Sequence, residues 1–316
     1  MGSRQNAMPE LPEVETIARG LSRRVTGDVI ESVWLGQKKE PLKSPAAVIA
    51  AALEHSRISA VRRMGKHIVF DLDRLDSAAP TPSSANGKRQ KQESKNRSRS
   101  TSAALALEVN HRVVPRTKAQ WIVHLGMTGR LQVCDPLAEV EKHTHAVVKL
   151  RSGREVRFVD PRRFGRLSVA ISAEFDATGM EPLEVDVETF IHLFRGRKTP
   201  IKSALLNQKL LRGVGNIYAD ESLFRAGIRP RRRGDSISRN QLAKLHTAVK
   251  AVLEEAIALG GSSISDYVDA DGEAGFFQLQ HRVYGREGEP CLICKTGIER
   301  VVIGGRSSHY CPRCQK

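Results

Sequence analysis

The chain has 316 residues, of which 40% are hydrophobic, and its 51 Lys and Arg against 35 Asp and Glu give a formal net charge of +16. The sequence contains no apolar run long enough to cross a membrane and no apolar segment of a signal peptide, so we expect a cytoplasmic protein with no membrane partner. The positive charge favours a polyanionic partner such as nucleic acid, although charge that serves only solubility is the alternative.

An amphipathic helix is predicted for residues 9–24. Its apolar side chains recur at helical spacing, and they are Leu11, Val14, Ile17, Ala18 and Leu21. Pro12 is compatible with this helix because it falls in the first turn.

Short strand-like runs follow the helix and predict an antiparallel β structure. They cover residues 29–35, 57–72, 120–133, 145–150, 154–160 and 165–171, with turn signals between them. A stretch at 77–118 interrupts the series. It holds nine Lys and Arg against two Asp and Glu, so seven of the sixteen excess charges belong to it. Its Ser, Lys and Arg content predicts a disordered basic insertion.

The hydrophobic period becomes helical from about residue 186. Expected helices cover residues 187–194, 200–208, 216–227 and 238–259. In the last of these, Ser238 and Gln241 form a capping-box pattern, and Gly260 follows the end of the helix. Asn216 is expected at the N-cap of the third, where free backbone N–H groups can bind a phosphate, although a plain turn between helices has the same glycine-rich pattern.

The C-terminal tail has the spacing of a four-thiolate zinc site. Its two Cys-x2-Cys pairs are separated by sixteen residues, and they comprise Cys291, Cys294, Cys311 and Cys314. The alternative is four thiols without a metal. The residues between the pairs predict a β-hairpin with Arg306 at its turn. Cys134 fits neither a metal site nor a catalytic group.

Two loops carry residues that suit a contact with DNA. The segment DPRRFG at 160–165 combines Arg162 with the aromatic Phe164, and HLGMTGR at 124–130 places Met127 between two glycines. Each loop could instead have no contact with DNA, because arginines are common at solvent-exposed hairpin ends and methionine often packs in protein cores.

Six motifs, in one order, resemble those of the formamidopyrimidine-DNA glycosylase family. They are PELPEVE, HLGMTGRL, DPRRFG, GVGNIYADESLF, GGSSISDYV and the terminal GRSSHYCPRCQ that follows the first Cys pair. The PELPE start is closer to the bacterial 8-oxoguanine enzymes than to the endonuclease VIII branch, which has a PEGPE-like start. The resemblance implies an α+β fold. It comprises an antiparallel β-sandwich flanked by helices (9–172), a helix–two-turn–helix domain (186–285) and a β-hairpin zinc finger (286–316).

The resemblance also implies a function. Family members excise oxidised purines, 8-oxoguanine and formamidopyrimidines, from double-stranded DNA through a Schiff base and cleave the abasic site by β,δ-elimination. Carried over by position, Pro9 is the nucleophile, Glu10 the acid, Lys66 the residue of β-elimination and Arg306 that of δ-elimination. Burial has to raise the pKa of Glu10 before it can donate a proton at neutral pH.

Further positions match residues that contact DNA in the family. Those expected to bind DNA are His143, Arg162, Arg197 and Asn216, and those expected to fill the gap left by the extruded base are Met127, Arg162 and Phe164. Residues 265–278 correspond to the lid over that base. We expect a monomer with one structural Zn²⁺ and no organic cofactor.

The position of Pro9 sets a condition on this chemistry. A proline nitrogen in an amide bond is not a nucleophile, so we expect translation to start at Met8, and residues 1–8 to be a non-native or misannotated leader that the active protein lacks. Two alternatives remain: the same chemistry on oxidised pyrimidines, and a noncatalytic damaged-DNA-binding paralogue in which Pro9 is not terminal. The basic insertion either adds nonspecific affinity for DNA or has no role.

Overall fold

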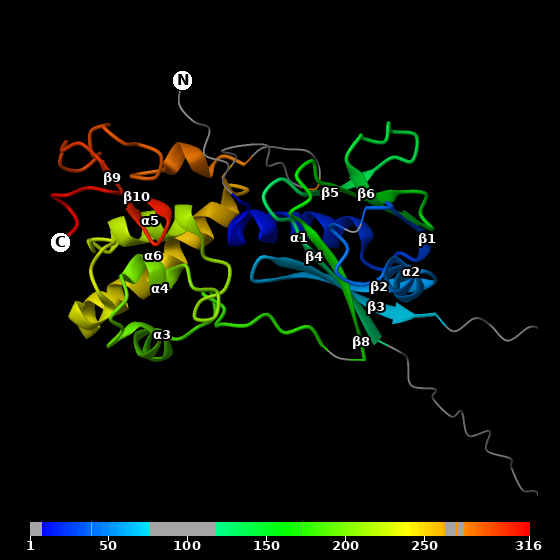
Figure 1. The fold of residues 1–316 in the computed structure, drawn as a ribbon, viewed down its shortest axis with the longest axis horizontal. Coiled ribbons are helices and arrows are strands. Elements are labelled where there is room, and N and C mark those ends of the chain that lie inside the picture. Colours follow the sequence, from blue (N-terminus) through cyan, green and yellow to red (C-terminus); the bar gives the residue numbers. More distant parts are fainter. Residues whose placement is uncertain (1–7, 39, 76–117, 173, 263–269, 271–274) are drawn as a thin grey trace, which may run out of the picture.

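The alternating apolar segments form two four-stranded antiparallel sheets, and helices gather in a second lobe beside them (Figure 1). This computed structural model describes residues 8–38, 40–75, 118–172, 174–262, 270 and 275–316. Predictions about residues 1–7, about nearly all of the insertion and about most of the lid therefore lie outside the described residues. Lys118, the last residue assigned to the insertion, begins a strand.

The two sheets face each other as a sandwich, as predicted. One contains β1 (Ile30–Leu35), β6 (Thr144–Leu150), β7 (Glu155–Val159) and β5 (Arg130–Cys134), in that order. The other contains β2 (Ser56–Met64), β3 (His67–Arg74), β4 (Lys118–His124) and β8 (Arg166–Ile171). Phe70, Trp121 and Phe158 are among the fully buried side chains of their shared core. Burial of this apolar surface is the main term that stabilises the lobe.

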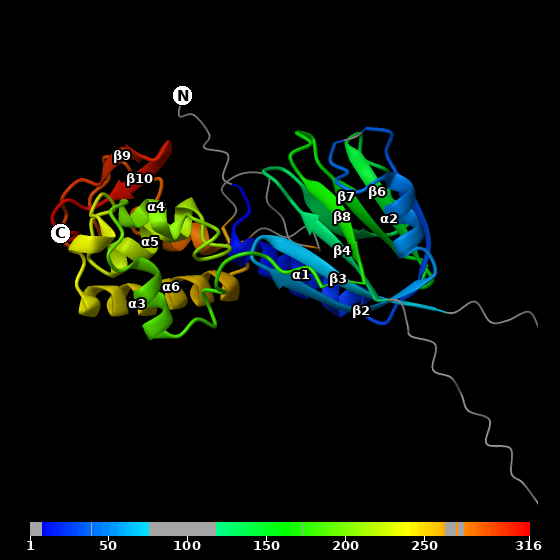
Figure 2. The same ribbon diagram turned by 60° about the horizontal axis from the view of Figure 1, so that its bottom comes forward.

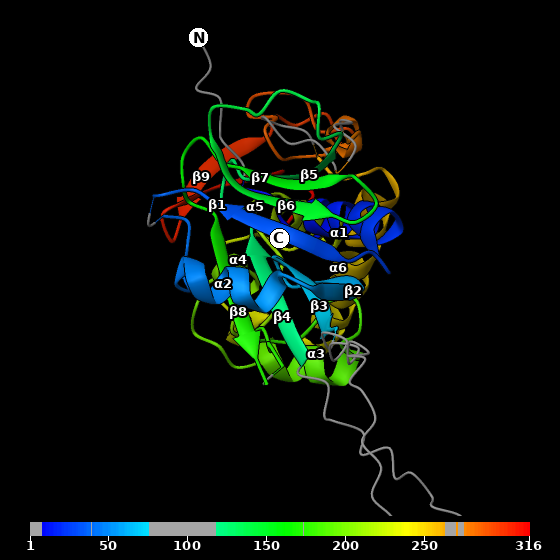
Figure 3. The same cartoon turned by 90° about the vertical axis from the view of Figure 1, so that its right-hand side faces the viewer.

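Helix α1 (Leu11–Val25) joins the two lobes. Leu11 lies in the helical core, whereas Val14 and the apolar residues after it lie in the sandwich core. The Leu11 N–H also donates a hydrogen bond to the Gly213 carbonyl at 3.0 Å, which ties the start of α1 to the helical lobe. A second helix, α2 (Ala46–Leu53), packs across β1, β4 and β8 (Figure 3). Helix α2 was not predicted, because its alanine-rich run has no polar face and hence no helical period.

The helical lobe contains α3 (Val187–Phe194), α4 (Ile201–Leu205), α5 (Asn216–Arg225) and α6 (Arg239–Ala258), with short 3-10 turns at Gly234–Ser236 and Phe277–Gln280. The capping box of α6 is present, because the Ser238 hydroxyl accepts from the Gln241 N–H and the Gln241 amide oxygen accepts from the Ser238 N–H. The N-cap prediction for Asn216 is wrong. Gly215 is the N-cap of α5, and Asn216 is its first residue.

The C-terminal hairpin consists of β9 (Glu299–Ile303) and β10 (Arg306–Tyr310) and packs against α5 (Figure 1). A fully buried ion pair fixes its position: the Lys202 ammonium lies 2.6 Å from the Asp220 carboxylate, and both side chains are 0% exposed. Lys202 also donates to the Ser307 carbonyl at 2.6 Å, and Asp220 accepts from the His309 N–H at 2.9 Å. The hairpin is therefore aligned on the helical lobe by polar contacts to two of its residues.

Strand direction brings several loops to the end of the sandwich that faces the helical lobe (Figure 2). The turn between β2 and β3 lies there with the segments 125–129, 143–144 and 160–165, since the paired ends of β4, β8, β6 and β7 meet at this end. Within the described residues, none of the helices combines the length and hydropathy that a membrane crossing needs.

The buried pair generates a test of stability. Replacing Asp220 with Leu leaves the Lys202 ammonium buried without its counterion, so we expect the free energy of unfolding in urea to fall by about 3–5 kcal/mol. The double variant Lys202→Met/Asp220→Leu removes the unpaired charge and should recover part of that loss.

The Arg225–Glu255 pair, whose carboxylate is exposed to solvent, provides the control. Glu255 is 50% exposed, so Glu255→Gln should change the free energy of unfolding by no more than about 1 kcal/mol. Equal losses from Asp220→Leu and Glu255→Gln would contradict the importance assigned to the buried pair.

Candidate functional site

Glu10, at the N-cap of α1, lies against the start of α5 and is 3% exposed. Its Oε1 atom accepts a hydrogen bond from the Ile217 N–H at 3.1 Å. This contact requires glycine at residue 215, because a Cβ there would lie 2.2 Å from the Glu10 carboxyl carbon. The Oε2 atom is buried and has no hydrogen-bond partner among the described residues, so its capacity to form a hydrogen bond is unused.

Burial raises the pKa of Glu10 to about 7, against the opposing effect of the Lys66 ammonium and the backbone N–H groups of α5. A carboxyl group with this pKa holds its proton in a substantial fraction of molecules near neutral pH. The burial that the sequence analysis required for a proton donor is therefore present.

Glu13 holds the backbone of the same turn. Its Oε2 atom accepts from the Glu10 N–H at 2.8 Å, while Oε1 accepts from the Ser262 N–H at 2.8 Å and from the Tyr218 hydroxyl. Burial raises the pKa of Glu13 as well. Glu13 was not among the predicted site residues. Its three-residue spacing from Glu10 is the signal that could have identified it, because residues three apart lie on one side of a helix.

A cavity of about 560 Å³ opens between the two lobes at this point. Met8, which precedes the buried Pro9, contributes to its wall together with Gly215 beside Glu10. Lys66 and Arg306 line the same cavity. The segment before α1, the β2–β3 turn and the start of β10 therefore meet at one space, which Lys66 and Arg306 line.

The environment of Lys66 makes it a weaker base than an ordinary lysine. The surrounding protein desolvates its half-buried side chain and lowers the pKa of the ammonium. The charge of Arg306 lowers the pKa further, while Glu10 and Glu13 raise it. A larger share of neutral amine is available near pH 7 as a result.

Met127, Arg162 and Phe164 gather on two neighbouring loops at the end of the sandwich. The Arg162 guanidinium lies 4.9 Å from the centre of the Phe164 ring, and Phe164 is 51% exposed. Gly126, with φ of +67°, allows the two loops to touch directly, since a Cβ there would lie 2.5 Å from the Phe164 carbonyl carbon. An exposed aromatic ring under a guanidinium suits contact with stacked bases.

The other predicted DNA contacts are placed separately. His143 is exposed, in the segment that precedes β6. Asn216 begins α5 and is partly buried. Arg197 is exposed in the turn between α3 and α4 and is not among the residues that line the cavity.

Some residues of the cavity wall were missed by the sequence analysis. His67, His124 and Phe175 form a cluster in which each ring centre lies 5.0 Å from that of its neighbour. Burial lowers the pKa of His124 to about 3, so its imidazole is neutral at physiological pH. The motif HLGMTGR contains His124, but a single histidine at a strand end carries no signal of its own.

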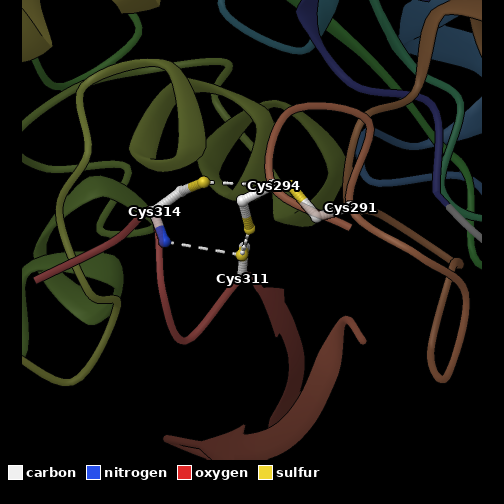
Figure 4. Close-up of side chains that lie close together, drawn as sticks. All are labelled: Cys291, Cys294, Cys311 and Cys314. Carbon is white, nitrogen blue, oxygen red and sulfur yellow. Dashed lines mark hydrogen bonds between the residues drawn. The ribbon is translucent and has the colours of Figure 1, made fainter. Parts of the chain in front are cut away.

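The four C-terminal cysteines converge at the base of the hairpin (Figure 4). Their Sγ atoms all lie within 4.8 Å of one another, with 3.4 Å between Cys294 and Cys311 and 3.9 Å between Cys291 and Cys314. Four sulfurs arranged at 2.3 Å around a zinc ion would be separated by about 3.8 Å. The thiols are free rather than joined in disulfides, so the donor set and its spacing fit a four-coordinate metal.

Three family models match the chain in order. The formamidopyrimidine-DNA glycosylase N-terminal domain matches residues 8–167, the H2TH domain of the same enzymes matches 178–268, and the zinc finger found in FPG and IleRS matches 288–316. The formamidopyrimidine-DNA glycosylase of Solibacter usitatus is 41% identical, over 98% of this chain and the whole of that protein.

Solved structures are similar over the same length. The Fpg protein of Thermus thermophilus has a TM-score of 0.74 and 35% identity, with 97% of this chain and 98% of that chain covered. The Lactococcus lactis Fpg in complex with DNA that contains an abasic site has a TM-score of 0.76 and 28% identity, with 97% and 99% covered. The same Lactococcus protein bound to DNA with an oxidised pyrimidine has a TM-score of 0.76 and 27% identity, with 98% and 100% covered.

These similarities extend through the sandwich lobe, the helical lobe and the hairpin, and they confirm the fold that the motifs predicted. The chain therefore belongs to the formamidopyrimidine-DNA glycosylase family, whose members are DNA glycosylases with abasic-site lyase activity.

Proposed function

We propose that this protein excises oxidised purines, 8-oxoguanine and formamidopyrimidines, from double-stranded DNA and then cleaves the strand at the resulting abasic site. The observation that carries this proposal is the buried carboxyl group of Glu10, with an unpartnered Oε2 atom and a pKa of about 7, beside a cavity that Lys66 and Arg306 line. A proton donor and two cationic groups around one space suit a reaction that opens a sugar and releases phosphates.

The nitrogen of Pro9 is the proposed nucleophile, in a chain that begins at this residue. A terminal amine has an ordinary pKa near 8, so roughly a tenth of it is neutral at pH 7. This nitrogen bonds to C1′ of the damaged nucleotide, the bond from C1′ to the base breaks, and the departing base takes up the proton that the Pro9 nitrogen gives up. Glu10 donates its proton to the sugar ring oxygen as the ring opens, which leaves an iminium ion, the Schiff base.

The Schiff base makes a C2′ proton removable. Loss of this proton breaks the bond from C3′ to its oxygen and releases the 3′ phosphate. In a second elimination, loss of the C4′ proton breaks the bond from C5′ to its oxygen and releases the 5′ phosphate. Lys66, with its lowered pKa, can accept a proton in the first elimination, and the Arg306 guanidinium can hold the phosphate that departs in the second.

The remaining site residues are proposed to hold the DNA. A base that leaves the duplex leaves a gap, and Met127, Arg162 and Phe164 offer apolar and planar side chains to fill it. His143, Arg197 and Asn216 are proposed to contact the DNA backbone. On this view residues 9–172 supply Pro9, Glu10 and Lys66, residues 186–285 grip the duplex, and residues 286–316 grip it and also supply Arg306. One chain acts as a monomer in the cytoplasm.

Zn²⁺ is the proposed ion of the cysteine cluster. Cys291, Cys294, Cys311 and Cys314 would hold it as four thiolates, which leaves no open position for a substrate and gives the ion a structural role. The proposed reaction requires no organic cofactor.

Oxidised pyrimidines are the second candidate substrate, because a Lactococcus relative has been solved with DNA that contains one. Parallel excision assays on otherwise identical duplexes separate the two. A faster rate with 8-oxoguanine or a formamidopyrimidine supports the proposal, and a faster rate with an oxidised pyrimidine replaces it with the alternative.

The role of Pro9 is tested with two versions of the chain, one that begins at Pro9 and one that keeps residues 1–8. We expect borohydride to trap a covalent adduct with an abasic duplex only for the first, because the nitrogen is an amide in the second. Equal trapping by both versions would exclude Pro9 and direct attention to a lysine such as Lys66. Absence of an adduct from both would favour the noncatalytic alternative.

The role of Glu10 is tested with Glu10→Gln, which keeps the size of the side chain but cannot donate the proton. We expect the rate of 8-oxoguanine excision to fall by about 10²- to 10⁴-fold. Because only the protonated acid acts, the wild-type rate should also decline as the pH rises through about 7, and the residual activity of Glu10→Gln should lack this decline. Glu31→Gln, at an exposed site on β1, is the control. An alkaline decline that persists in Glu10→Gln would assign the acid elsewhere.

Metal analysis tests the cysteine cluster. The purified protein should contain one zinc per chain, and Cys311→Ser should lose it and bind duplex DNA at least about tenfold more weakly, since the hairpin that carries Arg306 loses its anchor. Cys134→Ser should keep both the zinc and the affinity. Full zinc content in Cys311→Ser, or its loss in Cys134→Ser, would contradict the assignment.

A further inference from the structure

Asp160, the first residue of the DPRRFG segment, is a buried acid for which the proposed chemistry has no use. It follows β7 at the end of the sandwich that faces the helical lobe, and it is 0% exposed. A buried carboxylate is costly unless hydrogen bonds satisfy its oxygens, so its partners indicate what it does.

The carboxylate joins the two loops that carry Met127 and Phe164. Oδ1 accepts from the Thr128 hydroxyl at 2.6 Å and from the Arg162 N–H at 3.2 Å, and Oδ2 accepts from the Gly165 N–H at 2.7 Å. One side chain thus binds Thr128, which follows Met127, and also binds Arg162 before Phe164 and Gly165 after it. Hydrogen bonds to an ionised acceptor are among the stronger ones in proteins.

The backbone of Asp160 adds a third segment. Its N–H donates to the His143 carbonyl at 3.0 Å, and its carbonyl oxygen lies 3.0 Å from the His145 Nε2 atom, which donates to it. The three segments therefore share a single residue, and each of them carries one or two of the side chains proposed to contact DNA: Met127, His143, Arg162 and Phe164.

We propose that Asp160 is a positioning residue that holds these three segments as one preformed unit, ready to enter the gap when the damaged base leaves the duplex. Side chains that are already ordered lose less conformational entropy when they insert, so the extruded state forms more readily. This inference rests on the proposed function, because it requires that the protein extrudes a base.

The test compares two reactions of the same protein. Asp160→Asn keeps the shape but replaces one acceptor oxygen with an NH2 group that faces N–H and hydroxyl donors. We expect 8-oxoguanine excision from a duplex to fall at least about tenfold. Borohydride trapping on a single-stranded oligonucleotide with a preformed abasic site, which has no base to extrude and no stack to fill, should stay within about threefold of wild type.

Two further variants keep the proposal testable if Asp160→Asn folds poorly. Thr128→Val removes one hydrogen bond to the carboxylate and should lower duplex excision selectively, whereas Thr128→Ser keeps the hydroxyl and should restore it. Asp28→Asn is the matched control, because Asp28 accepts from the Val29 and Ser152 N–H groups at the opposite end of the same sheet. Asp28→Asn should leave both reactions unchanged.

The outcomes separate this inference from the function on which it rests. A wild-type protein that neither excises nor traps would overturn the proposed function and the inference with it. Given an active wild type, full duplex excision by Asp160→Asn and Thr128→Val would overturn the inference alone. Equal losses in duplex excision and single-strand trapping would also overturn it, since they indicate only a general loss of structure.

Discussion

The contact between Glu10 and the start of α5 is the interaction on which the site depends. The carboxyl group reaches the Ile217 N–H only because Gly215 has no side chain, and the adjoining Leu11 N–H binds the Gly213 carbonyl. These contacts fix the start of α1 to the helical lobe while the rest of α1 is buried in the sandwich. The contacts that join the two lobes therefore also bury Glu10 and raise its pKa.

The segment that carries Arg306 is held in place by buried polar contacts. Arg306 is the first residue of β10 in the hairpin. The carbonyl of the next residue, Ser307, accepts a hydrogen bond from the Lys202 ammonium. The Lys202–Asp220 pair is completely removed from water, so it is a poor source of stability compared with apolar packing. What it contributes is alignment, because two atoms of β10 bind to it and no sliding of the hairpin would satisfy both.

Local patterns in the sequence predicted much of this fold. The six predicted strand-like runs cover the eight strands of the sandwich, two of them spanning two strands each. Helices α3 and α6 were found from their hydrophobic periods, and the capping box located the start of α6. Prediction failed where a segment had no local pattern, or where contacts with residues distant in the sequence determined its conformation. The alanine-rich α2 has no polar face to give a period. At α5, asparagine is a good capping residue, but the cap position has to admit the Glu10 carboxyl and only glycine leaves room for it.

The motifs likewise identified some residues of the site but not the contacts that hold them. Motif resemblance assigned Glu10, Lys66 and Arg306 to one site. The structure brings Lys66 and Arg306 to one cavity, and Glu10 is buried beside Gly215 in its wall. No sequence pattern predicted the contacts that bury Glu10 or position Arg306, because the partners are far apart in the chain. Glu10 and Ile217 are 207 residues apart, and Lys202 and Ser307 are 105 apart. Asp160 shows the limit most directly. In the sequence it stands near two arginines, as a solvent-exposed acid would. Only the fold shows that its carboxylate is buried and accepts hydrogen bonds from backbone and hydroxyl donors of two loops.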